Sequence, residues 1–149
     1  MPDANETTQP VVELSHWYDA TPERVFHAWT DAEALARWMG PFNVTTEVHE
    51  QDLRVGGGFS WTMSEDNAYP VKGIFLVIEP PRHLVFTWVW QHGDYEGIET
   101  EVDLTMAPED GGTRLTLVHK RLVDATAREK HTHGWTSCLH DNLTAFLAS

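Results

Sequence analysis

Residues 126–147 read TAREKHTHGWTSCLHDNLTAFL, and their pattern predicts one long helix. Its large apolar residues recur at spacings of four, four, three and one, which is typical of an amphipathic helix; they are Trp135, Leu139, Leu143, Phe146 and Leu147. Thr126 and Glu129 form a capping box at its start. The 22 residues span about 33 Å at 1.5 Å per residue, which is long enough to cross a sheet of about seven strands. Gly134 lowers helix propensity by about 1 kcal/mol relative to alanine, so we expect another group to approach the backbone there.

The sequence before this helix alternates with a period of two, which predicts antiparallel strands with one face exposed to water. The alternating apolar sets are Val44, Thr46 and Val48; Phe59, Trp61 and Met63; Leu84, Phe86, Trp88 and Trp90; and Ile98, Thr100, Val102, Leu104 and Met106. Residues 71–78 are almost wholly apolar, which predicts a central strand. Residues 11–18 and 113–120 are expected to form the first and last strands.

Two short helices are predicted between the first strand and the second. Thr21 is a suitable N-cap and is followed by proline at the first helical position. Thr30 and Glu33 form a capping box that is expected to start the second helix. Residues 39–41, Met-Gly-Pro, are expected to end it. The resulting order of elements predicts an α+β domain.

The length of 149 residues is that of one domain. Residues 1–10 are expected to form a flexible N-terminal tail, and residues 11–149 a single domain. The one cysteine excludes an intramolecular disulfide and favours a reducing compartment. The net charge of −13 argues against nucleic acid and anionic membranes as partners. The sequence shows neither a membrane-spanning apolar run nor a signal peptide, so we expect a cytoplasmic protein.

Several stretches, in a consistent order from about Val11 to Leu147, resemble one known family. They are TPERVFHAWTD (21–31), LARWMGP (35–41), RVGG (54–57), IEPPRHLVFTW (78–88), GTRLTL (112–117) with His119, and Gly134-Trp135. The sequence resembles homologues of the activator of the heat-shock-protein-90 ATPase, within the START-related SRPBCC superfamily. The resemblance implies a helix-grip (START/birch-pollen-allergen-like) fold over residues 11–149. In that fold a curved antiparallel sheet of about seven strands wraps the long C-terminal helix and leaves a cavity between them.

The resemblance implies several kinds of activity, because this superfamily includes lipid and hormone binders, aromatic polyketide cyclases and co-chaperone domains. The chaperone activators carry an additional chaperone-binding domain, for which 149 residues leave no room. The resemblance implies no catalytic residue and no cofactor. A role in the stress response is an expectation that rests on the family's chaperone members.

The candidate ligand-binding residues are those whose strand or helix position faces the space between sheet and helix. They are Trp61, Trp88, Leu104, Leu117, His119, Trp135 and Leu139, with Trp38 and Met39 near the mouth if the family arrangement holds. A tryptophan-rich wall suits a flat aromatic or polyketide-like molecule. The alternative is that these side chains pack together and leave no cavity.

His119 is the one candidate for acid–base catalysis, because it shares strand parity with Leu115 and Leu117 and points inward. The alternative is a core histidine whose ring nitrogens are satisfied by neighbours. Cys138 is expected to be buried and inert.

Other polar groups are expected to lie on the surface. His131 and His133 are about 200° apart on a helix, and only His133 and His140 share a face, so no metal site is expected. Three acidic residues lie on the face of their strand opposite to its apolar residues: Glu99, Glu101 and Asp103. They are expected to be solvated. Residues 56–58 are three glycines that lack the rest of a phosphate-binding loop, and they are expected to form a bend.

The sequence thus predicts a small binding protein for an apolar or aromatic ligand, with no cofactor and no metal. The first alternative is a cyclase- or hydrolase-type enzyme that uses the same cavity with His119 as acid or base. The second is an interaction protein that modulates a chaperone through the acidic outer face of its sheet.

Overall fold

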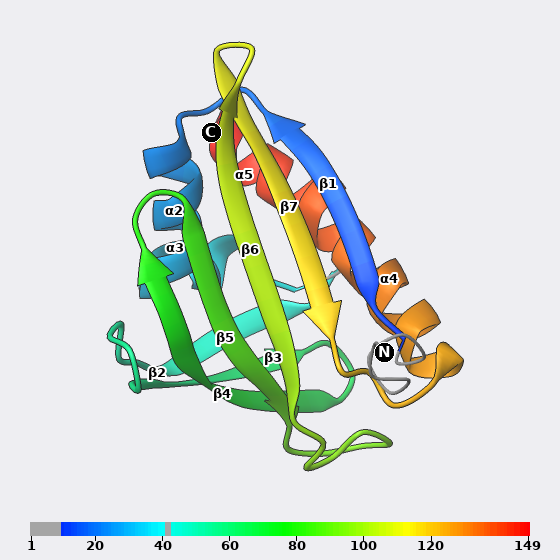
Figure 1. Ribbon diagram of the computed structural model, residues 1–149. Helices are drawn as coiled ribbons and strands as arrows, with labels where there is room; N and C mark the ends of the chain where they lie inside the picture. Colours follow the sequence, from blue (N-terminus) through cyan, green and yellow to red (C-terminus); the bar gives the residue numbers. More distant parts are fainter. Residues whose placement is uncertain (1–9, 41–42) are drawn as a thin grey trace, which may run out of the picture.

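A computed structural model describes residues 10–40 and 43–149. The residues of the expected tail before Pro10, and Pro41 of the expected helix stop, lie outside these ranges. The elements in chain order are β1 (Val12–Tyr18), α2 (Pro22–Thr30), α3 (Ala32–Trp38), β2 (Thr45–Gln51), β3 (Gly58–Ser64), β4 (Ala68–Glu79), β5 (His83–Trp90), β6 (Thr100–Glu109), β7 (Gly112–Lys120), α4 (Ala125–Ser137), η1 (Cys138–Leu143) and α5 (Thr144–Ala148) (Figure 1). The predicted α+β order is confirmed.

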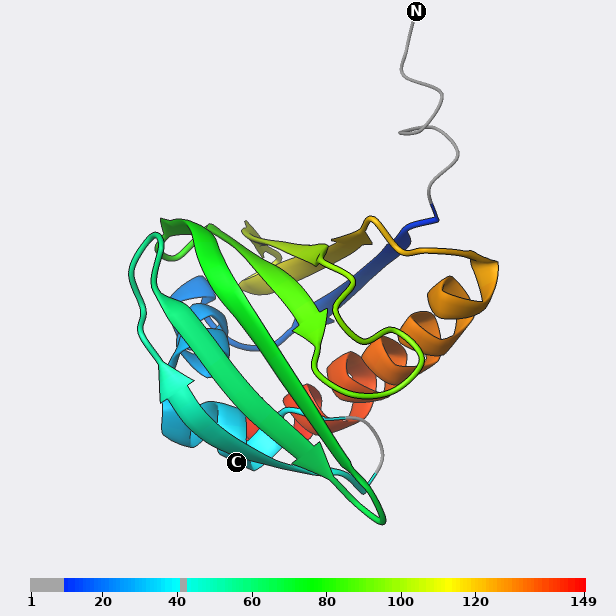
Figure 2. The same cartoon turned by 90° about the horizontal axis from the view of Figure 1, so that it is seen from below.

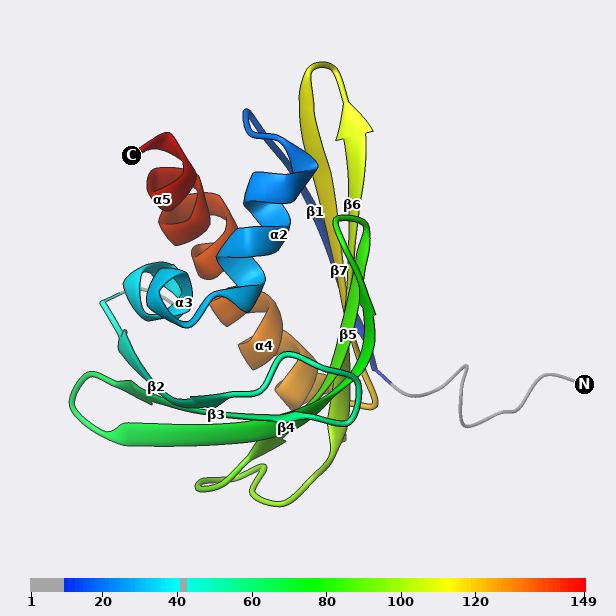
Figure 3. The same ribbon diagram turned by 90° about the vertical axis from the view of Figure 1, so that its left-hand side faces the viewer.

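The strands form one seven-stranded sheet in the order β1-β7-β6-β5-β4-β3-β2, and each neighbouring pair is antiparallel. The sheet curves, and the C-terminal helical run lies in its hollow together with α2 and α3 (Figure 3). This arrangement confirms the predicted helix-grip fold. Alternate residues of each strand therefore face the helices, and the residues between them face solvent.

The sheet bends along β4, the strand that contains Gly73 (Figure 3). A Cβ atom at this position would lie 1.9 Å from the carbonyl oxygen of Thr87 and 2.2 Å from Cε2 of Phe59. The pairing of β4 with β5 also shifts register between Phe75 and Val77. The bend turns β2, β3 and β4 across one end of the hollow, while β6 and β7 run along it (Figure 3). Glycine at this position therefore lets the sheet close around the helix.

The starts of α2 and α3 follow the predicted chemistry with one correction. The hydroxyl of Thr21 accepts from the backbone N–H of Arg24 at 3.2 Å, as expected of an N-cap. The cap of α3 is Asp31 and not Thr30, since Asp31 Oδ2 accepts from the N–H of Ala34 at 3.0 Å. Thr30 is the last residue of α2, and its hydroxyl donates to a carbonyl of that helix. The expected capping box is therefore wrong by one residue.

The C-terminal helical run differs from the predicted helix at two places. Its N-cap is Asp124, whose side chain accepts from the N–H of Ala127 at 2.8 Å, so the expected cap at Thr126 is wrong. The segment η1 is a π-helix, which the spacing of apolar residues does not reveal. Here the Tyr18 hydroxyl donates to the carbonyl of Leu139 at 2.8 Å and ties the helix to β1. Short π-helices inside α-helices are frequent at functional sites.

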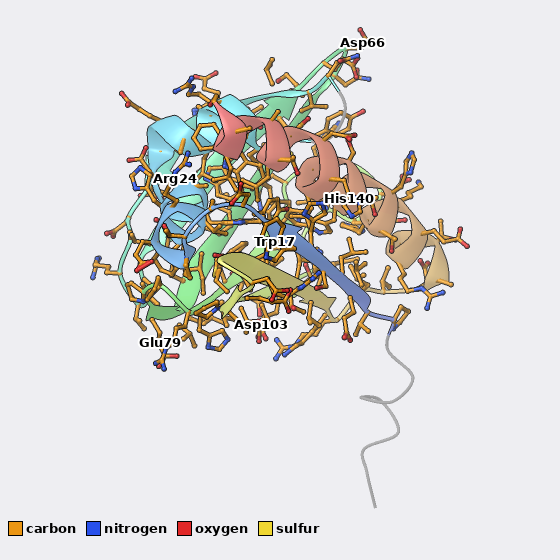
Figure 4. The ribbon with its side chains drawn as sticks, turned by 90° about the horizontal axis from the view of Figure 1, so that it is seen from above. Trp17, Arg24, Asp66, Glu79, Asp103 and His140 are labelled. Atoms are coloured by element: carbon orange, nitrogen blue, oxygen red, sulfur yellow. The ribbon has the colours of Figure 1, made fainter. Side chains whose placement is uncertain are left out.

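Ion pairs on the outer face of the sheet hold two of the three acids that were expected to be solvated. The side chains of Glu101 and Asp103 are 16% and 23% exposed, and Lys120 Nζ lies 3.6 Å from a carboxylate oxygen of each. His83 Nε2 lies 2.8 Å from Asp103. In Figure 4, Asp103 and Glu79 lie on the side of the sheet opposite the helices. The expectation of a solvated acidic face is therefore wrong for Glu101 and Asp103.

Each helix within residues 10–40 and 43–149 is too short or too polar to cross a bilayer.

Candidate functional site

A cavity of about 280 Å³ lies between the sheet and α4 and opens to solvent. Its wall is built from β3, β4, β5 and α4, from Met39 after α3, and from the loop at 91–99 that follows β5. In Figure 2 this loop passes alongside α4. The cavity therefore lies where the helix-grip fold is expected to bind a ligand.

Aromatic rings make a large part of the wall. Trp88 and Trp90 come from β5, and Trp135 comes from α4. The Trp88 ring centroid lies 5.2 Å from that of Trp135 and 5.4 Å from that of Trp90. Tyr69 and Tyr95 complete the aromatic part of the wall. These contacts hold the rings at the offset and edge-on distances that aromatic pairs prefer.

Sulfur-containing side chains make a second, softer part of the wall: Met39, Met63 and Cys138. Thioethers are flexible and polarizable, and they make favourable contacts with aromatic rings. Burial raises the pKa of the Cys138 thiol to about 12, so the thiol is uncharged at neutral pH. This side of the cavity is therefore apolar and without charge.

The mouth of the cavity carries its charged groups. Lys130 Nζ lies 3.7 Å from Asp94 Oδ2 and 5.7 Å from the centroid of the Tyr95 ring. These contacts join the 91–99 loop to α4. Both partners of the ion pair are more than half exposed, so the pair contributes about 0–1 kcal/mol to stability.

His119 lies directly behind the wall, and both of its ring nitrogens have partners. The indole N–H of Trp135 donates to His119 Nδ1 at 3.0 Å, so the proton of the neutral ring is on Nε2. Nε2 lies 2.7 Å from the hydroxyl of Thr100, which itself donates to the carbonyl of Trp88 at 2.8 Å. Burial, and second the neighbouring His131, lower the pKa of His119 well below its ordinary value. The side chain is therefore a neutral link that fixes two wall tryptophans relative to each other.

His131 lines the cavity, so the expectation of a surface position is wrong for this residue. Its Nδ1 donates to the carbonyl of Ala127 at 2.7 Å, and its Nε2 accepts from the indole N–H of Trp90 at 3.1 Å. Burial is the main cause that lowers its pKa. The signal was present in the sequence: His131 lies four residues before Trp135 and so shares its helix face.

The predicted site residues fall into two groups. Trp88 and Trp135 line the cavity, and Met39 lines it near α3. The remaining ones are buried around it: Trp38, Trp61, Leu104, Leu117, His119 and Leu139. Four further residues line the cavity that the sequence patterns did not predict: Met63, Tyr69, Trp90 and Tyr95. Of these, Trp90 had a usable signal, because it shares strand parity with Trp88.

Two of the buried tryptophans already use their indole N–H groups. Trp38 donates to the carbonyl of Ala28 at 2.8 Å, and Trp61 donates to Gln51 Oε1 at 3.0 Å. Trp88 differs, because its N–H is buried and has no hydrogen-bond partner among the described residues. Trp61 packs against Trp88 with ring centroids 5.7 Å apart.

Within residues 10–40 and 43–149, no three or more histidine, cysteine, aspartate or glutamate side chains gather as metal ligands. His16 and His140 do meet between β1 and the C-terminal helical run, with ring centroids 4.5 Å apart, and Figure 4 labels His140 there. This pair lies outside the cavity wall.

Comparison with known proteins supports the fold and the family. A family model described as "Activator of Hsp90 ATPase homolog 1-like protein" matches residues 19–148. The crystal structure of protein CV1439 from Chromobacterium violaceum is 26% identical, with a TM-score of 0.84 over 94% of this chain and 99% of that one. The AHSA1 protein SPO3351 from Silicibacter pomeroyi is 30% identical, with a TM-score of 0.81 over 93% and 98%. CalU16 from Micromonospora echinospora is 30% identical, with a TM-score of 0.71 over 94% and 77%. No curated protein sequence matches this chain significantly.

Proposed function

We propose that this chain, which belongs to the family of Activator of Hsp90 ATPase homolog 1-like proteins, is a binding protein for a small aromatic molecule held between its sheet and α4. The observation that carries the proposal is the solvent-connected cavity walled by Trp88, Trp90 and Trp135. Ligand sites are concave and mostly apolar, with a few placed polar groups. This wall has that composition.

The size of the cavity supports a ligand of one or two rings. A buried apolar cavity of about 150 Å³ holds one benzene ring in a well-studied case. The cavity here is about 280 Å³, which is nearly twice that volume. It lies just below the range of about 300–1,000 Å³ for ligand pockets. A bicyclic aromatic molecule therefore matches it better than a sterol or a long fatty acid.

Binding is better supported than catalysis by a cyclase or hydrolase. A general acid or base needs a ring nitrogen or carboxylate within hydrogen-bond reach of the substrate. Both nitrogens of His119 and both nitrogens of His131 are already paired with protein groups, so neither histidine is available as acid or base. His92 and Asp94 also line the cavity and are the groups that a cyclase or hydrolase would have to use. The alternative that this chain is an interaction protein that modulates a chaperone rests on the family resemblance and stays a prediction.

An NMR titration with a matched pair of variants tests the proposal. Saturable shifts of the Trp88, Trp90 and Trp135 indole signals are expected with one- and two-ring aromatic compounds, and weaker effects with sterols. Gly134 lines the cavity, so Gly134→Leu is expected to reduce binding at least tenfold. Thr126→Leu places the same side chain on an exposed site of α4 and is expected to bind like the wild type. The proposal fails if no compound moves the three signals, or if both variants bind equally well.

A further inference from the structure

Three residues line both the cavity and a second, much smaller hollow: Trp90, Tyr95 and His131. The second hollow has a volume of about 10 Å³, which is about the space that one water molecule needs. Its other lining residues include Leu122, which precedes α4, and Ala127 in the first turn of α4. The three shared residues therefore stand between the two hollows.

The two hollows lie in line along the C-terminal helical run. The cavity contacts this run from Lys130 to Cys138, and the second hollow contacts it at Ala127 and His131. Ala127, His131, Trp135 and Cys138 follow one another at spacings of four, four and three residues, so they share one helix face. Residues 127–138 span about 16 Å at 1.5 Å per residue. A flat molecule that lies along this face and passes the three shared residues would occupy both hollows.

Two of the three shared residues are held in place by hydrogen bonds. The indole N–H of Trp90 donates to Nε2 of His131 at 3.1 Å, and Nδ1 of His131 donates to the carbonyl of Ala127 at 2.7 Å. Trp90 belongs to β5 and His131 belongs to α4. These two side chains are therefore fixed parts of the wall.

Tyr95 is the third shared residue, and it comes from the 91–99 loop. The centroid of its ring lies 5.8 Å from that of His131, and Lys130 Nζ lies 5.7 Å from it. A cation–π contact at an exposed site contributes about 0.5–1 kcal/mol. Removal of the Tyr95 ring thus opens a passage between the two hollows and leaves intact the hydrogen bond between the other two shared residues.

We infer that Tyr95 determines the length of the bound molecule. Its ring closes the cavity on the side of Ala127, so that one or two fused rings fit and a third ring in line with them does not. This inference rests on the proposed function, because it needs the cavity to bind an aromatic ligand. It adds a specificity-determining residue to that site.

Two probes that differ by one linearly fused ring test the inference: quinoline and acridine. Dissociation constants of both are measured at pH 8, where both probes are uncharged, for the wild type and for Tyr95→Ala. The ratio of the quinoline constant to the acridine constant is expected to rise at least tenfold in Tyr95→Ala. The reason is that the third ring becomes buried along α4 in the variant and stays outside the cavity in the wild type.

Two control variants separate the position of the ring from a general enlargement of the cavity. Tyr69→Ala removes the same side chain from the cavity at a residue that is 42% exposed and does not line the second hollow. Tyr95→Phe keeps the ring and removes only the hydroxyl. Both variants are expected to keep the ratio of the wild type. An equal rise in Tyr69→Ala, or no rise in Tyr95→Ala, overturns the inference.

A measurement on the wild type keeps the inference testable if Tyr95→Ala does not fold. The NMR signals of Gly134 and Cys138 are expected to shift when quinoline saturates the cavity, whereas the methyl signals of Leu122 and Ala127 stay in place behind the Tyr95 ring. Shifts of all four residues by quinoline overturn the role of Tyr95 and leave the proposed function standing. Failure of both probes to bind any of the proteins overturns the proposed function itself.

Discussion

Trp135 donates its indole N–H to Nδ1 of His119, and this 3.0 Å bond joins the C-terminal helix to the last strand of the sheet. The bond fixes the tautomer of His119, which places the ring proton on the side of Thr100. It also fixes the ring of Trp135, which lines the cavity. One buried hydrogen bond thus couples the position of the helix to the shape of the wall.

The first prediction concerns the strength of this coupling. His119→Phe leaves the indole N–H of Trp135 buried without an acceptor and is expected to lower the free energy of unfolding by about 1–3 kcal/mol. Trp135→Phe removes the donor. If the bond carries the effect, the double variant is less destabilised than the sum of the two single variants. Urea unfolding of the four proteins measures the coupling, and simple additivity of the two losses contradicts it.

The second prediction concerns pH. Burial lowers the pKa of His119 in the folded protein, so below about pH 6.5 the unfolded chain binds a proton that the folded protein does not. The stability is therefore complete above about pH 6.5 and is lost as the pH falls below it. The free energy of unfolding is expected to drop by about 1 kcal/mol between pH 7 and pH 5.5 from this residue alone. His119→Gln cannot titrate and is expected to show a smaller drop over the same interval. An identical pH dependence in the variant rules out His119 as the cause.

The fold was predictable because it depends on patterns that local sequence carries. Strand parity placed Phe59, Trp61, Trp88 and Leu104 on the buried face, and all four are buried. The period of residues 126–147 placed Trp135 on the same side. Such patterns predict which face of a strand or helix is buried, and the helix-grip arrangement follows from these buried faces.

The cavity was less predictable, because a pattern of apolar residues does not predict which of the buried side chains leave empty space between them. Leu104 and Leu117 satisfy the same parity rule as Trp88, yet they are packed in the core. Part of the wall comes from the 91–99 loop, whose Tyr95 has no periodic signal. The free N–H of Trp88 also depends on the distances to every neighbouring acceptor, which no sequence pattern contains.

The third prediction concerns the bend of the sheet. Gly73→Ala forces a Cβ atom against the carbonyl of Thr87 and the ring of Phe59, and it is expected to cost more than about 3 kcal/mol or to prevent folding. Gly93→Ala is the matched control, because its φ of +99° is unfavourable for alanine but the space around it is open. That variant is expected to lose about 1–2 kcal/mol. Thermal or urea unfolding of both variants checks the difference, and equal losses contradict the steric explanation.

The fourth prediction concerns Cys138, the one cysteine of the chain, which is 3% exposed in the cavity wall. Burial raises the pKa of its thiol to about 12, so at pH 8 the reactive thiolate is on the order of one molecule in 10⁴. An unperturbed thiol, with a pKa near 8.5, is about one quarter ionised at that pH. A disulfide reagent such as DTNB is therefore expected to label the folded protein at least a thousandfold more slowly than the protein in concentrated urea. Cys138→Ser supplies the blank. Labelling of the folded protein at the rate of a free thiol shows that the cavity wall opens far more often than its packing implies.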